Sequence, residues 1–196
     1  MNIKFNIFLF FITISNFCYS QGTEDYNYII NQLIPVRTET IVEKYKNGNL
    51  KRMASITYYN VEGEEHGVYT GKYVKYLKDG GISLERENDL AGSPLIVKVY
   101  YKGELLSTKK TIELNTNSKK IDVFLFQSKN TSMICEYEGY ELDENGESNI
   151  MLKGVLINDK RSGLWVRFNN GKIKKTKNYK GITRFERIPK TKHIKA

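Results

Sequence analysis

Histidine and cysteine are scarce in this sequence, and their scarcity excludes several kinds of site. The 196 residues include two histidines, His66 and His193, and two cysteines, Cys18 and Cys135. Metal sites made from these side chains need three or four ligands close together, and the sequence has no such cluster. We therefore expect no metal site and no cofactor.

Common catalytic motifs are also missing. The sequence has no Gly-rich phosphate loop and no Gly-x-Ser-x-Gly elbow. A Cys135–His66 dyad would need the fold to bring two distant segments together. Glu64, Glu65 and His66 precede a glycine, and a solvated acidic loop explains them more simply than a cation site does. We expect a protein that is not an enzyme; a hydrolase with a dispersed site is the alternative.

The first 20 residues have the three parts of a secretory signal. Lys4 is their only charge, residues 7–14 form an apolar run, and Cys18-Tyr19-Ser20 precedes the expected cut before Gln21. A membrane anchor is the alternative, but the run falls short of the roughly 20 apolar residues that cross a bilayer. Lipidation at Cys18 is a second alternative, although Phe17 is large for such a signal. We expect an exported protein that is periplasmic, outer-membrane-associated or extracellular.

Removal of this signal would leave Cys135 as the only cysteine, which excludes an intramolecular disulfide. Cys135 lies in Ile134-Cys135-Glu136-Tyr137, where a buried, unreactive thiol is the simplest interpretation. The fold must therefore be stabilised by packing and hydrogen bonds alone.

The positive charge is concentrated at the C-terminal end. The whole chain has a formal net charge of +9. From residue 172 onward Glu186 is the only acid, and the basic residues there are Lys172, Lys174, Lys175, Lys177, Lys180, Arg184, Arg187, Lys190, Lys192 and Lys195. The body before residue 172 is close to neutral.

The pattern of the mature chain predicts a mainly β protein with one helix. Thr23 can cap a helix over 21–35, in which Tyr26, Ile29, Ile30 and Leu33 form one apolar stripe and Pro35 marks the end. Short β segments follow, separated by turns such as Asn47-Gly48 and Asn170-Gly171. We expect strands at 41–45, 50–59, 71–77, 82–86, 95–101, 104–109, 121–127, 132–137, 150–157, 163–168 and 172–180. Residues 61–67 are expected to be an acidic loop.

One unit occurs twice. Gly71-Lys72-Tyr73-Val74-Lys75-Tyr76 and Gly163-Leu164-Trp165-Val166-Arg167-Phe168 both read as Gly-x-aromatic-Val-basic-aromatic, and each is followed by a turn and a second strand. Alternation places Leu164, Val166 and Phe168 on one face and Trp165 and Arg167 on the other. One hairpin cannot bury a face alone, so units of this kind must stack.

This unit resembles the MORN repeat, in the form found in the bacterial YwqK-like group that has an antitoxin label. The match covers residues 159–172 best, with Tyr179-Lys180-Gly181 closing the unit, whereas Tyr73 replaces Trp in the first copy. The resemblance implies an elongated antiparallel sheet of β-hairpin repeats over 36–188, with a division near 111–120 left open and a basic tail at 189–196. It implies packing roles for Gly71, Tyr73, Tyr76, Gly163, Trp165, Phe168, Gly171 and Tyr179. An antitoxin role conflicts with an export signal.

The basic strand is the best candidate for a binding site. Alternation places Lys172, Lys174 and Lys180 on one face of it, and Ile173, Lys175, Lys177 and Tyr179 on the other, so it is expected at an exposed edge. Edge lysines can simply discourage aggregation. Together with Arg184 and Arg187 they can also bind a protein or an anionic envelope surface, such as lipid headgroups or polysaccharide. Nucleic acid fits the charge but not the expected location. The sequence thus predicts an exported binding or scaffold protein.

Overall fold

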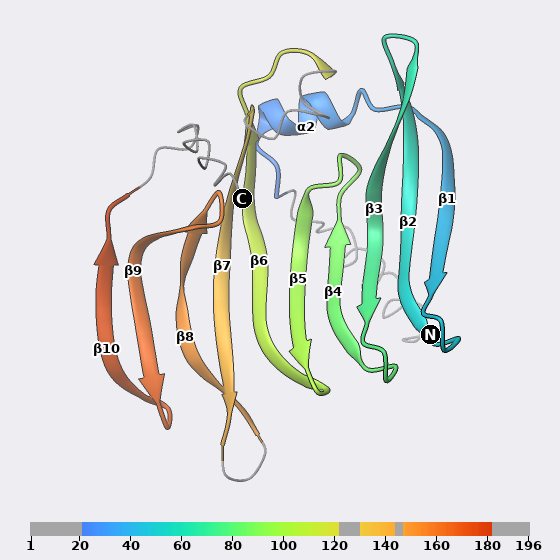
Figure 1. Ribbon diagram of the computed structural model, residues 1–196. Helices are drawn as coiled ribbons and strands as arrows, with labels where there is room; N and C mark the ends of the chain where they lie inside the picture. Colours follow the sequence, from blue (N-terminus) through green and yellow to red (C-terminus); the bar gives the residue numbers. More distant parts are fainter. Residues whose placement is uncertain (1–20, 122–129, 144–146, 182–196) are drawn as a thin grey trace, which may run out of the picture.

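In the described part of the chain, the fold is one open antiparallel sheet with one short helix packed against it (Figure 1). The computed structural model describes residues 21–121, 130–143 and 147–181. The sheet has ten strands, and their order in space is their order in the chain. Their bounds are β1 Pro35–Lys44, β2 Leu50–Val61, β3 Glu64–Tyr76, β4 Ile82–Asn88, β5 Pro94–Tyr101, β6 Glu104–Thr116, β7 Thr131–Leu142, β8 Ser148–Ile157, β9 Lys160–Asn169 and β10 Lys172–Tyr179. The predicted fold class is confirmed.

Tight turns set the pairing of neighbouring strands. Lys102-Gly103 and Asn170-Gly171 join their strands as predicted, with positive φ at both residues of each turn. Such turns have the twist that antiparallel strands need. The Asn47-Gly48 hairpin also forms, but its loop spans the whole interval between Lys44 and Leu50.

One expectation for the middle of the chain needs correction. The acidic stretch 61–67 is not a loop, because Glu62-Gly63 is a tight turn and β3 begins at Glu64. The polar stretch 111–120, where a division was left open, continues β6 as far as Thr116, paired with β7. The strand expected at 121–127 lies mostly outside the described residues.

Helix α2 spans Glu24–Ile30, and Thr23 caps it as predicted. It ends well before Pro35, because the chain turns at Asn31 and Gln32 and Pro35 begins β1. The predicted apolar stripe does pack on the sheet. Tyr26 and Ile29 are buried against Leu114 of β6.

The N-terminal segment links the middle of the sheet to its first strands. Leu33, just after α2, packs against Tyr59 and Val61 of β2. Before α2, the backbone N–H of Thr23 donates to the carbonyl of Leu114, and the N–H of Leu114 donates to the carbonyl of Gln21. Residues 21–33 therefore hold β6 and β2 together across three intervening strands. No helix in the described part of the chain is both long and apolar enough to cross a membrane.

Candidate functional site

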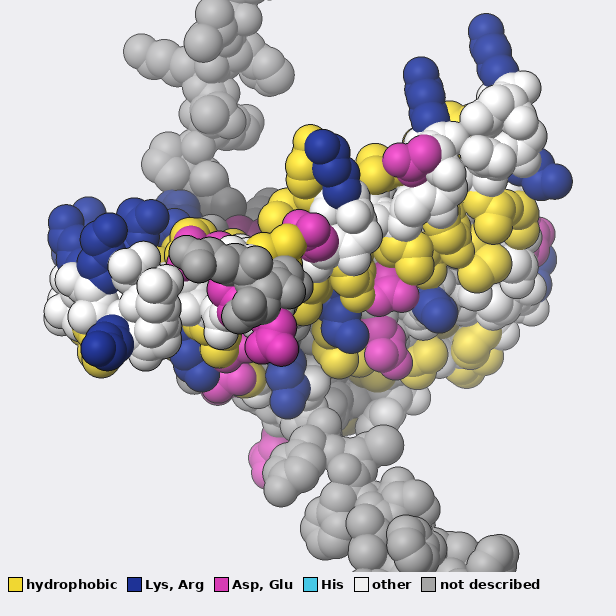
Figure 2. Space-filling view, turned by 90° about the horizontal axis from the view of Figure 1, so that it is seen from below, with side chains coloured by type: hydrophobic (Ala, Val, Ile, Leu, Met, Phe, Trp, Pro, Cys, Tyr) yellow, Lys and Arg dark blue, Asp and Glu magenta, His cyan; other side chains and the backbone are white. Residues whose placement is uncertain are grey.

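The basic strand predicted as a binding site is β10, and it is an edge of the sheet as expected. Among the described residues its only strand neighbour is β9, so no described strand pairs with its outer side. Lys172, Lys174, Lys175 and Lys177 are exposed, and so is Lys180 just beyond the strand. Arg184 and Arg187 lie outside the described residues. Figure 2 shows Lys and Arg side chains gathered along this side of the sheet, on the left.

The register corrects how the β10 side chains divide between the faces. A register shift between Ile173 and Lys175 breaks the alternation, and Ile173 pairs with Phe168 while Lys175 pairs with Arg167. Cross-strand partners share a face of the sheet. Ile173 therefore lies on the face of Phe168, opposite to that of Lys175 and Lys177.

An arginine and three aromatic rings lie beside these lysines. The ring centroids of Trp165 and Tyr137 are 5.6 Å apart, and those of Trp165 and Tyr179 are 6.2 Å apart. The Arg161 guanidinium carbon lies 4.5 Å from the centroid of the Trp165 ring. Arg161 also donates to the Tyr179 hydroxyl at 3.0 Å, and this bond lowers the pKa of Tyr179. Stacking on a ring restricts the position of a guanidinium, so Arg161 presents its charge in a defined place.

The two copies of the repeated unit share a backbone feature. Gly71 and Gly163 have φ values of +58° and +63°, a region that side chains rarely adopt. Two residues later, Tyr73 and Trp165 are buried, with exposed fractions of 6% and 3%. Each ring is covered by an arginine, with the Arg86 guanidinium carbon 4.6 Å from the Tyr73 centroid.

The glycine that the Trp165 ring approaches closely is Gly154, and not Gly163, for which a packing role was expected. A Cβ on Gly163 would meet nothing within 4 Å, whereas one on Gly154 of β8 would lie 2.3 Å from the Trp165 ring. The other residues expected to pack are placed as follows: Tyr76 and Phe168 are half-buried, Tyr179 contacts Trp165, and Gly171 lies in the β9–β10 turn.

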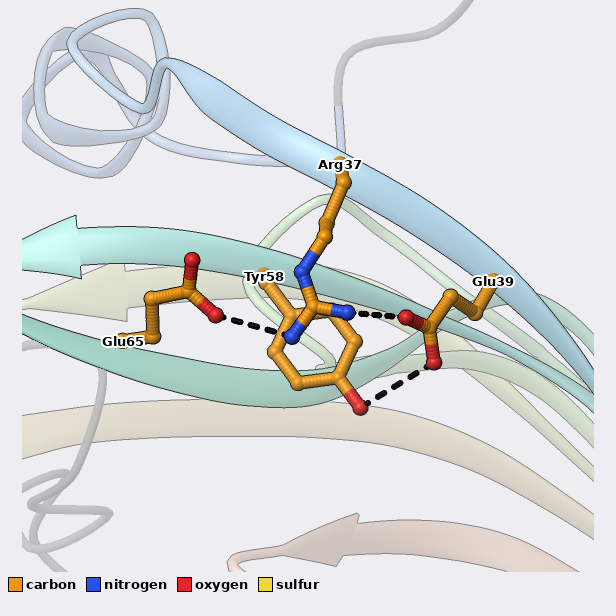
Figure 3. Close-up of polar contacts among 4 residues, drawn as sticks. All are labelled: Arg37, Glu39, Tyr58 and Glu65. Carbon is orange, nitrogen blue, oxygen red and sulfur yellow. Dashed lines mark hydrogen bonds and ion pairs between the residues drawn. The ribbon is translucent and has the colours of Figure 1, made fainter.

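The opposite edge of the sheet has its charges neutralised. Arg37 of β1 lies over the ring of Tyr58, 3.8 Å from its centroid, between the carboxylates of Glu39 and Glu65 (Figure 3). The Arg37–Glu65 contact is 2.8 Å. On β2, Arg52 likewise pairs with Glu43 of β1. The β1 edge is thus a network of paired charges, whereas the lysines of β10 have no carboxylate partner among the described residues.

The residues considered for catalysis are not brought together. His66 is on β3 and Cys135 is on β7, four strand spacings apart, which corresponds to roughly 19 Å across a sheet. Cys135 is fully buried, and burial raises the pKa of its thiol. Among the described residues, no group of three or more His, Cys, Asp or Glu side chains is placed to hold a metal ion.

The sequence did not reveal that Arg161 lies beside Trp165 and Tyr179, or that Arg86 and Lys75 lie beside Tyr73. The strand register, which brings separate strands together, decides which residues share a face.

No protein-family model matches the sequence, and no curated protein matches it. Among solved structures, the chain is similar to a crystal structure of a DUF3836 family protein from Parabacteroides distasonis ATCC 8503, at 8% sequence identity over 62% of this chain and 90% of that chain. The TM-score is 0.18, which is too low to support any statement about fold or function.

Proposed function

We propose that this protein is an exported, non-enzymatic binding module of MORN-like β-hairpin repeats that holds an anionic partner in a bacterial envelope. The open sheet and the shared geometry of Gly71–Tyr73 and Gly163–Trp165 support the repeat. The export signal, which lies outside the described residues, supports the location.

The observation that favours binding is that the lysines of the edge strand β10 have no carboxylate partner among the described residues. Lys172, Lys174, Lys175 and Lys177 project from β10, and the structure shows no ion pair for any of them within its described ranges. Cations near an anionic surface contribute about 1 kcal/mol each. Four such side chains together contribute roughly 4 kcal/mol, which corresponds to a dissociation constant of about 1 mM.

Sedimentation with envelope fractions from a bacterium tests this function. The variant with Lys172→Gln, Lys174→Gln, Lys175→Gln and Lys177→Gln should stay in the supernatant at a salt concentration where the wild type sediments. The variant with Arg at the same four positions keeps the charge and should still sediment. Equal sedimentation of the wild type and the Gln variant would refute a role for β10, and turnover of a small substrate by the purified protein would refute the non-enzymatic assignment.

A further inference from the structure

The charges of the sheet are sorted between its two faces. Side chains of direct cross-strand partners lie on the same face, so the pairing register defines rows that run across the strands. Two such rows lie on the face of Trp165. The first row is Ile41–Ala54–Tyr73–Arg86–Val97–Lys109–Tyr137–Gly154, continued by Trp165 and Lys177. The second row is Glu43–Arg52–Lys75–Leu84–Val99–Ser107–Gly139–Leu152–Arg167–Lys175. We call this the basic face, because Glu43 is the only acid in these two rows; Glu39 and Glu65 lie on the same face beyond the rows, where both pair with Arg37.

The other face is balanced. Its rows contain four charged pairs of cross-strand neighbours, each of opposite sign. They are Lys72 with Glu87, Glu85 with Lys98, Lys110 with Glu136, and Glu138 with Lys153. The last pair is an ion pair at 3.1 Å. Cross-strand neighbours of opposite sign cancel in the net charge of this face, so the face attracts an anionic ligand only weakly.

On the basic face, the cations that have no carboxylate partner among residues 21–121, 130–143 and 147–181 form two groups. One group is Lys75 and Arg86, on β3 and β4, beside Tyr73. The other is Arg161, Arg167, Lys175 and Lys177, on β9 and β10, beside Trp165 and Tyr179. Between them, the second row is uncharged at Leu84, Val99, Ser107, Gly139 and Leu152. In the first row, Lys109 is paired with Asp159 at 2.7 Å. From β4 to β10 there are six strand spacings, roughly 29 Å across a sheet.

We propose that the basic face binds an acidic polysaccharide chain laid across the strands, with β10 as one end of the site. This inference rests on the proposed function and specifies its ligand. A linear polyanion repeats its charges along its length, so one chain can contact both cation groups, and the second contact is gained at high effective concentration.

Two other anionic ligands fit the geometry less well. Strands in a sheet typically twist by roughly 20° relative to their neighbours, so cations six strands apart face different directions and a flat lipid surface cannot meet both groups. Single-stranded nucleic acid uses free aromatic faces for base stacking. Tyr73 and Trp165 are buried beneath Arg86 and Arg161 and leave no such face.

The test compares two double variants of equal charge on opposite faces. Lys75→Gln with Arg86→Gln removes the cation group that is distant from β10. Lys72→Gln with Lys98→Gln removes the same charge from the balanced face. Binding to polygalacturonate, a linear uronic acid polymer, is measured by calorimetry with neutral dextran as a control polymer. The first variant should lose about tenfold or more in affinity, and the second should bind as the wild type does.

Two further measurements keep the test decisive. Lys75→Gln alone changes an exposed side chain and should lose affinity severalfold without affecting thermal unfolding. Digalacturonate, compared at equal uronate concentration, is too short to bridge the two groups and should bind far more weakly than the polymer.

Each other result has a distinct meaning. Loss of binding in the β10 variant alone would overturn the extended site and leave the proposed function intact. Equal binding by all variants would overturn both. Tighter binding to phosphatidylglycerol vesicles or to oligothymidylate than to polygalacturonate would overturn the choice of ligand, as would equal affinity for digalacturonate and the polymer.

Discussion

The indole of Trp165 lies directly against the backbone of Gly154 on the neighbouring strand. A Cβ at position 154 would come within 2.3 Å of the indole Cδ2 atom, closer than real Cβ contacts approach. The indole Nε1–H donates to the carbonyl of Val155 at 3.1 Å, which fixes the ring in that place. The absence of a side chain at Gly154 therefore allows the Trp165 indole to pack directly on the backbone of β8.

Gly154→Ala should displace the Trp165 ring and destabilise the fold by about 1–3 kcal/mol, the usual cost of overpacking a buried site. Trp165 is the only tryptophan in the chain, so its fluorescence reports this site alone. We expect a red-shifted emission in the folded variant and a lower denaturant midpoint. Gly181→Ala is the control, because a Cβ there meets nothing within 4 Å. An unchanged emission and midpoint in Gly154→Ala would contradict the packing described.

Hairpin turns and the edge position of β10 could be predicted from local sequence, because each depends on a few adjacent residues. The partner of Trp165 could not, since Gly154 belongs to the preceding strand and only the register brings the two together. The division of charge between the faces was hidden for a related reason. Register shifts near Leu95, Ile112 and Lys174 interrupt the two-residue alternation. Strict alternation read from the sequence therefore assigns the residues beyond each shift to the wrong face of the sheet.

Tyr26→Phe should weaken the attachment of α2 to the sheet. The Tyr26 hydroxyl donates to Asp89 Oδ2 at 2.5 Å and lies 2.8 Å from Ser93 Oγ, which joins the helix to the loop between β4 and β5. Loss of one buried hydrogen bond to a carboxyl group costs about 1–3 kcal/mol. Chemical denaturation measures the change. Tyr28→Phe is the matched control, since Tyr28 is 69% exposed on the same helix; an equal effect of both substitutions would show that the Asp89 bond is not the cause.

Asp89→Asn should change how stability depends on pH. Burial raises the pKa of Asp89 above its ordinary value near 3.8, despite hydrogen bonds from Tyr26 and the backbone that act in the other direction. The folded protein therefore retains this proton to higher pH than the unfolded chain does. The resulting stabilisation is complete below the ordinary pKa and is lost as the pH rises through the raised pKa.

Asparagine keeps the size of the side chain and cannot ionise. The stability of the wild type relative to Asp89→Asn should therefore fall as the pH is raised from about 4 and then become constant. Urea unfolding at a series of pH values measures this difference. A difference that grows with pH would mean that the hydrogen bonds to the ionised carboxylate outweigh its burial, opposite to the direction expected here.

Replacing Lys172, Lys174 and Lys175 by threonine should make the protein self-associate. No described strand pairs with the outer side of β10, and charged side chains keep such an edge from pairing with another chain. Threonine favours strands and removes the repulsion. Sedimentation velocity should show additional, concentration-dependent oligomers for this variant, while arginine at the same positions should leave the association state of the wild type unchanged. The two roles of β10 are separable in this way. If the threonine variant associates no more than the wild type and loses only ligand binding, the lysines serve the ligand, whereas additional oligomers formed with binding intact would show that they protect the edge.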